Sequence, residues 1–340
     1  MNTYNDLFIE FESKFNEYWY SLMDSSFFRQ EQFLLGNRLR PKIVFAGYLA
    51  AKSHSDISKN DIELVSKLSL SMELIHKASI ILDDLIDDDP KRHGKPTFHK
   101  EYGSNITYMF AANLLSISIK NLDDYISDLP DTDVLRKKGI HLLAQTMYDM
   151  SLGEVKELQL DSINKFNKAL IKNIISLETV PLIRNSLLLG YYAGDNYDEK
   201  VEKALRNIGD TCGYVFQILN DLEPFCNSDK LIAHKGRLNM DLQSDKKNIA
   251  LALLYELLSD DELKSITDKT LPQDERDKII IEFFHYYNIK QSIVRETEMI
   301  SSNVKELIFR LQNYNISINW CTFFFQYIDA IIKECNRRIT

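Results

Sequence analysis

Residues 80–94 read Ile-Ile-Leu-Asp-Asp-Leu-Ile-Asp-Asp-Asp-Pro-Lys-Arg-His-Gly and place five carboxylates within seven positions, directly after an apolar stretch. On a helix, Asp83 and Asp87 lie one turn apart on the same face, as do Asp84 and Asp88. Like charges at this spacing destabilise a helix by roughly 0.2–0.5 kcal/mol per pair. A neutralising partner is therefore expected, and the run predicts a functional site at the end of a helix.

A divalent cation is the partner that the acidic run favours. Oxygen ligands on a rigid helix suit Mg²⁺, which keeps several waters and bridges carboxylates to a substrate's phosphates. Arg92 and Lys95 follow closely and could hold the same anion from its other side. A solvated acidic turn is a weaker alternative, because residues 78–82 make the approach apolar. A calcium-hand loop lacks its Asp-x-Asp-x-Asp-Gly spacing here.

The composition indicates a globular, helical protein. Of 340 residues, 44% are hydrophobic and 27% charged, which is typical of soluble domains. The chain has 11 Gly and 7 Pro, a scarcity that favours one all-helical body. Its net charge is −9 and no Lys/Arg stripe is present, so nucleic acid is not an expected partner.

The cysteines indicate a reducing compartment. No two of them have the Cys-x-x-Cys spacing of a zinc site or redox pair. We expect free thiols at Cys212, Cys226, Cys321 and Cys335. The sequence shows neither a signal peptide nor the roughly 18–20 consecutive apolar residues that span a bilayer. A cytoplasmic protein that is not integral to a membrane is expected.

Apolar residues recur at three- and four-residue spacing almost throughout, which predicts ten to twelve helices in a single domain over residues 1–340. Two long apolar segments, 67–88 and 201–225, each end in acids. They could face each other across a cavity with metal at its mouth and a hydrophobic hole below, which suits a diphosphate head on a hydrocarbon tail. Alternatively, Asp221 and Glu223 merely begin an exposed loop.

Further motifs flank the acidic run in a fixed order. The segments are Gly36-Asn37-Arg38-Leu39-Arg40-Pro41, the helix from Glu73 through His76 to Asp84, Asp83-Asp84-x-x-Asp87 with Arg92, Gly94-Lys95-Pro96-Thr97, Phe216-Gln217 with Asp221, and Asp241-Leu242 with Lys246. Together they resemble the motifs of the trans-isoprenyl diphosphate synthase (polyprenyl synthetase) family over roughly residues 30–255. One Asp-Asp-x-x-Asp alone is weak support, whereas several motifs in order are strong.

The resemblance implies an all-α, isoprenoid-synthase-type helical bundle with a central apolar cavity, usually a homodimer, that uses Mg²⁺ to release diphosphate from an allylic prenyl donor. It implies catalytic roles for Asp83, Asp84, Asp87 and Arg92, and metal binding by Asp83, Asp84, Asp87 and Asp221. It also implies substrate contacts by Asn37, Arg40, His76, His93, Thr179, Phe216, Gln217 and Lys246.

Two departures concern the acceptor. Asn37 and His93 stand where the family has cations that grip isopentenyl diphosphate, while Arg40 and His76 remain. A hydrogen bond to a charged group is worth about 1.5–3 kcal/mol, so losing two cations weakens diphosphate binding. The sequence therefore favours a prenyltransferase whose acceptor is a neutral or aromatic small molecule. Asn37 and His93 could hydrogen-bond such an acceptor, and His93 or Glu178 could accept its proton.

Other departures concern the donor. Asn220 and Pro224 thin the second metal motif, where Glu223 could compensate. The family's Lys-Thr pair is Glu178-Thr179, a charge reversal beside a phosphate, although Lys246 remains. Three alternatives stay open: a chain-elongating polyprenyl (for example geranylgeranyl) diphosphate synthase that uses isopentenyl diphosphate, a terpene-cyclase-like enzyme, and a non-catalytic partner subunit.

The length of the prenyl chain is weakly readable. Ala78 and Ser79, about one turn before Asp83, are small and would let a long tail pass. Bulky residues on other helices could close the hole instead; the candidates are Phe110, Met147 and Met150. The aromatic tail, with Trp320 and Phe323-Phe324-Phe325, is expected to serve core or dimer packing.

Overall fold

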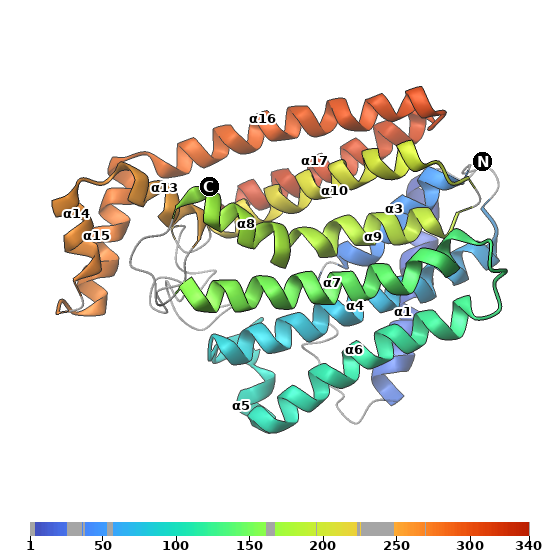
Figure 1. Cartoon of the computed structure of the whole chain (residues 1–340), viewed down its shortest axis with the longest axis horizontal. Helices are drawn as coiled ribbons and strands as arrows, with labels where there is room; N and C mark the ends of the chain where they lie inside the picture. The colour runs from blue at the N-terminus through green and yellow to red at the C-terminus, as the bar shows by residue number, and fades with distance from the viewer. Residues whose placement is uncertain are drawn as a thin grey trace.

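The computed structural model describes residues 4–25, 36, 38–52, 57–160, 167–194, 196–222, 225, 248–268 and 270–339. Long α-helices lie side by side along the molecule, and α13, α14 and α15 gather at one end (Figure 1). The expected all-α bundle is confirmed. The helices are α1 Tyr4–Ser25, α3 Leu39–Ala51, α4 Lys59–Ile86, α5 Phe98–Tyr102, α6 Ser104–Ile126, α7 Val134–Leu160, α8 Lys168–Glu178, α9 Val180–Tyr192, α10 Glu199–Asn220, α13 Ile249–Leu257, α14 Asp260–Thr267, α15 Gln273–Tyr286, α16 Ile289–Arg310, the 3₁₀ helix η3 Leu311–Tyr314, and α17 Ile318–Ile339.

Helix α9 forms the centre of the bundle. Its side chains are buried on all sides except at Arg184, as expected for a helix that is apolar all round. It packs against α3, α10, α7 and α4. Two glycines allow the close crossing with α3: a Cβ on Gly190 would lie 1.8 Å from the Val44 carbonyl oxygen, and one on Gly47 would lie 2.0 Å from that of Leu187.

Gly190→Ala is expected to destabilise the protein by about 1–3 kcal/mol, because the added methyl meets rigid backbone and the two helices must separate. Urea unfolding measures this loss. Gly139→Ala on α7 is the matched control, since its Cβ would lie 3.3 Å from leucine side-chain carbons that can move. Removing a helical glycine there gains about 1 kcal/mol. Equal stability of the two variants would contradict the close crossing.

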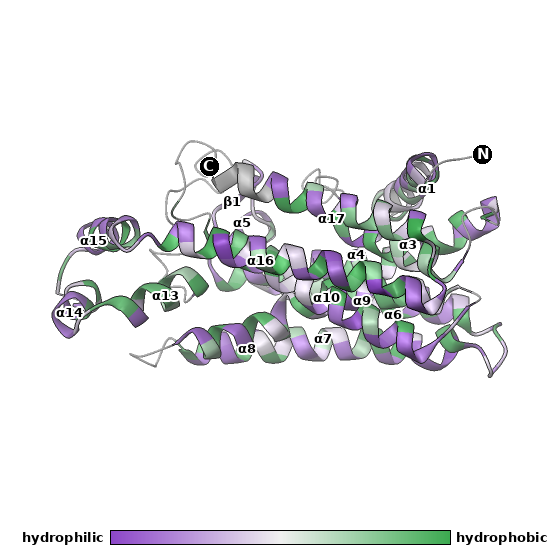
Figure 2. Ribbon diagram, turned by 90° about the horizontal axis from the view of Figure 1, so that it is seen from above, coloured by the Kyte–Doolittle hydropathy of each residue, from purple (hydrophilic) through white to green (hydrophobic). Residues whose placement is uncertain are grey.

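The outer helices are amphipathic. Purple and green residues alternate along α16 (Figure 2), whose buried residues include Ile289, Ile293, Val304 and Ile308. Helix α17 closes the bundle over α3, because Trp320 donates from Nε1 to the Ala46 carbonyl oxygen at 3.0 Å. The aromatic residues of 320–325 therefore pack within this chain, and of the two expected roles, core packing is the one the structure shows.

The stretch 88–103, between α4 and α6, contains regular structure. Strands β1 Lys91–Arg92 and β2 Lys95–Pro96 form an antiparallel hairpin, and α5 follows it. His93 and Gly94 form the turn with φ of 52° and 77°, as a type I′ hairpin requires. Together with other short helices, α5 raises the number of helices in the described part of the chain above the expected ten to twelve.

The described cysteines agree with the expected free thiols. Cys212 and Cys321 are unpaired and buried, and burial raises the pKa of Cys212 to about 12. Cys226 lies outside the described residues, as does the side chain of Cys335. Among the described helices, none combines the length and apolar character that a membrane span needs.

Candidate active site

Within the acidic run, Asp84 forms a salt bridge with Arg92. Asp84 is 4% exposed. Arg92, on β1, donates from Nε to both of its carboxylate oxygens, at 2.7 and 2.9 Å, and its Nη2 lies 2.5 Å from Oδ1. This bidentate pairing fixes the guanidinium at the end of α4. The same Nη2 lies 3.6 Å from an oxygen of Asp83, so Arg92 also faces that carboxylate.

Asp83 and Asp87 differ from Asp88 in position and contacts. Helix α4 ends at Ile86 with Asp87 as its C-cap, so Asp83 and Asp87 share one face. Asp88 has a left-handed backbone with φ of 52°, and its carboxylate contacts His99 and Lys100 of α5. The prediction that Asp84 and Asp88 share a helix face is therefore wrong, because the helix has already ended.

A pocket opens beside this turn. Its lining residues are Lys77, Ile80, Ile81, Asp84, Arg92, His93 and Phe98. The four from α4 recur at positions i, i+3, i+4 and i+7, which is one helix face. His93 is exposed, and loss of solvation together with Arg92 and Lys77 lowers its pKa. At neutral pH His93 is thus an uncharged imidazole that can donate or accept a hydrogen bond.

Cations surround His76 on the same helix. Loss of solvation, then the charges of Arg40, Lys77, Arg92 and Arg38, lower the pKa of His76 well below its usual value. Burial also lowers the pKa of Arg40, and the Nε of Arg40 is buried with no hydrogen-bond partner in the described part of the chain. Both residues were predicted to bind substrate, and the structure places them in one cationic neighbourhood.

Arg38 and Glu73 anchor this neighbourhood. Arg38 has φ of 52° and is 8% exposed. Its Nη1 lies 2.8 Å from an oxygen of Glu73, and its guanidinium lies 4.6 Å from the centre of the Trp19 ring. Glu73 is 2% exposed and also faces Lys77 at 3.7 Å. This pairing holds the start of α3 against α4 and α1.

Three residues predicted around the second motif lie in one hydrogen-bonded chain. Thr179 donates to Gln217 Oε1 at 2.7 Å, and Gln217 donates from Nε2 to Asp221 Oδ1 at 2.7 Å. Asp221 Oδ2 accepts from the backbone N–H of Ile249 at 2.9 Å, at the N-terminus of α13, where the helix dipole favours an anion. Asp221 is 6% exposed, so both its oxygens already serve the fold. Phe216 is buried in the core at 6% exposure.

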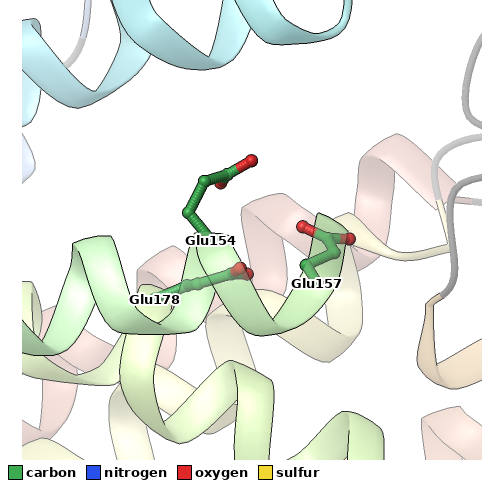
Figure 3. A group of neighbouring side chains, drawn as sticks. All are labelled: Glu154, Glu157 and Glu178. Atoms are coloured by element: carbon green, nitrogen blue, oxygen red, sulfur yellow. The ribbon is translucent and has the colours of Figure 1, made fainter. Parts of the chain in front are cut away.

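Sequence reasoning missed a cluster of glutamates beside Thr179. Glu154 and Glu157, one turn apart on α7, meet Glu178 from the end of α8, with carboxylate oxygens within 4.8 Å of one another (Figure 3). Gly153 allows this approach, because a Cβ there would lie 2.5 Å from Glu178 Cγ. The reversed charge at 178 therefore sits among other negative charges. The i, i+3 spacing of Glu154 and Glu157 was the available signal.

Several predicted residues lie outside the described residues: Asn37, Glu223, Pro224, Asp241 and Lys246. The cations around His76 also include Lys77 and Arg38, which the motifs did not single out. The signal for Lys77 was its place seven residues before Asp84, on the same helix face.

Comparison with known proteins decides the family. Residues 28–285 match the model of the polyprenyl synthetase family. The chain belongs to the polyprenyl synthetase family. This confirms the resemblance seen in the motifs.

Two relatives show how far the similarity extends. Component 2 of the heptaprenyl diphosphate synthase of Bacillus subtilis is 28% identical over 251 residues, which cover 73% of this chain and 66% of the relative. The short chain isoprenyl diphosphate synthase of Methanocaldococcus jannaschii is 25% identical over 233 residues, or 68% of this chain and 66% of the relative. The match thus spans just under two thirds of these relatives.

Solved structures share the fold. The decaprenyl diphosphate synthase of Rhodobacter capsulatus superposes with a TM-score of 0.78 at 18% identity, covering 98% of this chain and 97% of the other. The geranylgeranyl pyrophosphate synthase of Corynebacterium glutamicum, solved with isoprenyl diphosphate and magnesium, gives a TM-score of 0.76 at 18% identity, again over 98% and 97%. At these identities the likeness supports the helical architecture alone.

Proposed function

We propose that this protein is a chain-elongating prenyl diphosphate synthase, which transfers the prenyl group of an allylic diphosphate to isopentenyl diphosphate. The family match over residues 28–285, together with relatives named as diphosphate synthases, carries this proposal. The departures at Asn37 and His93 had favoured a neutral or aromatic acceptor. The cations around His76 argue against that expectation, because a neutral acceptor has no need of them.

Asp83 and Asp87 are the proposed metal ligands. They share the last helical face of α4, and the side chain of Asp83 is 40% exposed, so both can reach a cation held by oxygen atoms. An oxygen-only donor set of carboxylates suits Mg²⁺. When bound, the metal would stabilise negative charge on the departing diphosphate.

Asp84 and Arg92 have a different proposed role. Because both oxygens of Asp84 bind Arg92, Asp84 orients the guanidinium rather than binding metal directly. Arg92 then donates to the diphosphate as the C–O bond of the donor breaks. The freed allylic carbon bonds to the terminal alkene carbon of isopentenyl diphosphate, which loses a proton. Apolar side chains around the tail keep water from the allylic cation.

The second motif contributes less to binding of the donor diphosphate than the first motif does. Thr179 and Gln217 are half-buried and could turn toward a diphosphate. Asp221 would share its oxygens between a cation and the N-terminus of α13, because Gln217 and the Ile249 N–H already bind them. We propose that Asp221 contributes an outer contact to the metal cluster, held in place by these bonds.

We also infer a homodimer. Exposed apolar residues lie on the solvent side of α6, with Ile106, Met109 and Ile119, and of α7, with Tyr148 and Val155. Helices α6 and α7 pack against each other, so these apolar residues can contribute to one face. A second copy of the chain would bury this face. Sedimentation equilibrium distinguishes the dimer from a monomer.

Diphosphate release from an allylic donor tests the proposed reaction. The purified chain is assayed in Mg²⁺ with isopentenyl diphosphate, with an aromatic acceptor and with no acceptor. We expect isopentenyl diphosphate to stimulate release and EDTA to abolish it. Equal diphosphate release without an acceptor would favour a cyclase-like enzyme. Release that needs the aromatic compound would favour a prenyltransferase with a neutral or aromatic acceptor. No release at all would favour a non-catalytic subunit.

Glu178→Lys is expected to lower the KM of the allylic donor roughly 10-fold, the size of one charge-assisted hydrogen bond. The lysine restores a cation beside Thr179 and pairs with Glu154 and Glu157, which now lie within 4.8 Å of Glu178 as like charges. Steady-state kinetics at saturating isopentenyl diphosphate measures the change. Glu178→Gln is the control and removes the negative charge alone. A donor KM that rises in the lysine variant would overturn the assignment of residue 178 to the donor side.

A further inference from the structure

Glu296 on α16 is a partly buried carboxylate that contacts two other helices. Its side chain is 20% exposed. Lys168 and Lys172, one turn apart on α8, donate from Nζ to its two oxygens at 2.8 and 3.3 Å, and Tyr214 on α10 donates its hydroxyl at 3.2 Å. Burial opposes ionisation, but the hydrogen bonds and charges of the two lysines lower the pKa of Glu296 overall. One ionised carboxylate therefore ties α16 to both α8 and α10.

The helices that Glu296 joins also carry the residues assigned to the donor. Thr179 is the C-cap of α8. Gln217 and Asp221 follow Tyr214 on α10 at positions i+3 and i+7, which places the three on one helix face. Burial, and then the charges of Glu296 and Asp221, raise the pKa of Tyr214, so its hydroxyl stays a hydrogen-bond donor. Glu296 thus acts on the same face of α10 as the second motif.

Hydrogen bonds link α8, α10 and α13 in a closed ring. The chain from Thr179 through Gln217 to Asp221 continues to the first backbone N–H of α13. At the end of α13, Glu256 accepts from the backbone N–H of Lys168 at 3.1 Å, which returns to the start of α8. A shift of α8 therefore disturbs the bonds on both sides of the second motif.

We propose that Glu296 is a positioning residue for the allylic donor, which holds α8 and α10 at the separation that lets Thr179 and Gln217 bind its diphosphate together. The inference rests on the proposed function, because it takes these two residues to contact the donor. A helix moves as a rigid element, so a tilt at the start of α8, where Glu296 binds it, displaces Thr179 at its end. A misplacement of about 1 Å in a site can lower the rate roughly 100-fold. A residue outside both acidic motifs thereby sets the affinity for the donor.

Equilibrium binding of a thiolodiphosphate analogue of geranyl diphosphate, whose C–S bond ionises slowly, tests the inference in the presence of Mg²⁺. Glu296→Gln keeps the size of the side chain and removes its charge. It should raise the Kd roughly 10-fold, which corresponds to the loss of about one hydrogen bond to the diphosphate.

Glu202→Gln is the matched control. Glu202 lies in the first turn of α10 and, like Glu296, accepts from a lysine and a tyrosine, here Lys138 and Tyr197. It is about 27 Å along the helix from Asn220, at 1.5 Å per residue. Both glutamine variants should lower the melting temperature, but the Glu202→Gln variant should bind the analogue within about twofold of wild type.

A double variant separates positioning from a general loss of stability. If Glu296 acts through Thr179, adding Glu296→Gln to Thr179→Val should raise the Kd less than about threefold further. In steady-state assays of Glu296→Gln, the KM should rise for the donor and stay near wild type for isopentenyl diphosphate.

Three results would each overturn the inference: a wild-type Kd in Glu296→Gln, an equal rise in Glu202→Gln, or the full rise in the Thr179→Val background. Glu296-dependent binding of the analogue without any elongation would instead overturn the proposed function alone. No binding of the analogue to wild type would overturn both.

Discussion

Asp83→Asn is expected to lower kcat roughly 10³-fold, because the neutral amide can no longer hold the metal that stabilises the leaving diphosphate. Stability should change little. The Asp83 side chain is 40% exposed and lies 3.6 Å from Arg92, so the fold depends on it weakly. The measurement is kcat for diphosphate release at saturating Mg²⁺ and both substrates, with the melting temperature recorded for the same protein.

Two neighbours in the run provide the controls. Asp84→Asn should lose activity and also about 2–3 kcal/mol of stability, because it leaves the Arg92 guanidinium without its carboxylate. Asp88→Asn should keep wild-type activity and stability. Asp88 contacts His99 and Lys100, and asparagine tolerates the left-handed backbone at this position. If Asp83→Asn stays active, or if Asp88→Asn is equally inactive, the assignment of the metal face of α4 is wrong.

Ser79→Phe is expected to shorten the main product by at least one five-carbon unit. Ser79 lies one turn before Asp83 on the same helix face, is half-buried, and donates to the His76 carbonyl oxygen at 2.9 Å. A prenyl tail that extends from the diphosphate along this face must pass residue 79, and a phenyl ring would block it. Chromatography of the products from a short allylic donor shows the change.

Ser79→Ala separates bulk from the lost hydrogen bond and should give wild-type products. A folded, active Ser79→Phe enzyme with unchanged product length would place the tail elsewhere. Residues on other helices would then limit the length of the prenyl tail. Phe110 is one candidate, since it stacks on Phe98 of the pocket with ring centres 4.8 Å apart, and Met147 and Met150 remain the others.

The parts predicted well from the sequence depend on local spacing. The i, i+4 acids placed Asp83 and Asp87 on one face, and three-four periodicity gave the helical bundle. The end of α4 was predicted at Asp88 rather than Ile86, because the first proline after the helix is Pro90, three residues beyond Asp87. The contacts of Asp88 with α5 come from a hairpin that hydrophobic periodicity does not reveal.

The cluster of cations around His76 could not be predicted from local patterns. Lysine in a helix is usually exposed, whereas Lys77 is buried, with its Nζ 6.0 Å from the ring of Trp19 on α1. Comparison of positions 37 and 93 alone therefore suggested a pocket poor in cations. The second role of Asp221, at the N-terminus of α13, likewise depends on a contact between segments 28 residues apart.

Mass spectrometry of the reaction products tests the central claim most directly. The purified chain is incubated with Mg²⁺, an unlabelled allylic diphosphate and ¹³C-labelled isopentenyl diphosphate. A chain-elongating synthase yields allylic diphosphates that are heavier than the donor by whole labelled five-carbon units. Products that carry no label, such as hydrocarbons or alcohols derived from the donor alone, would contradict the account.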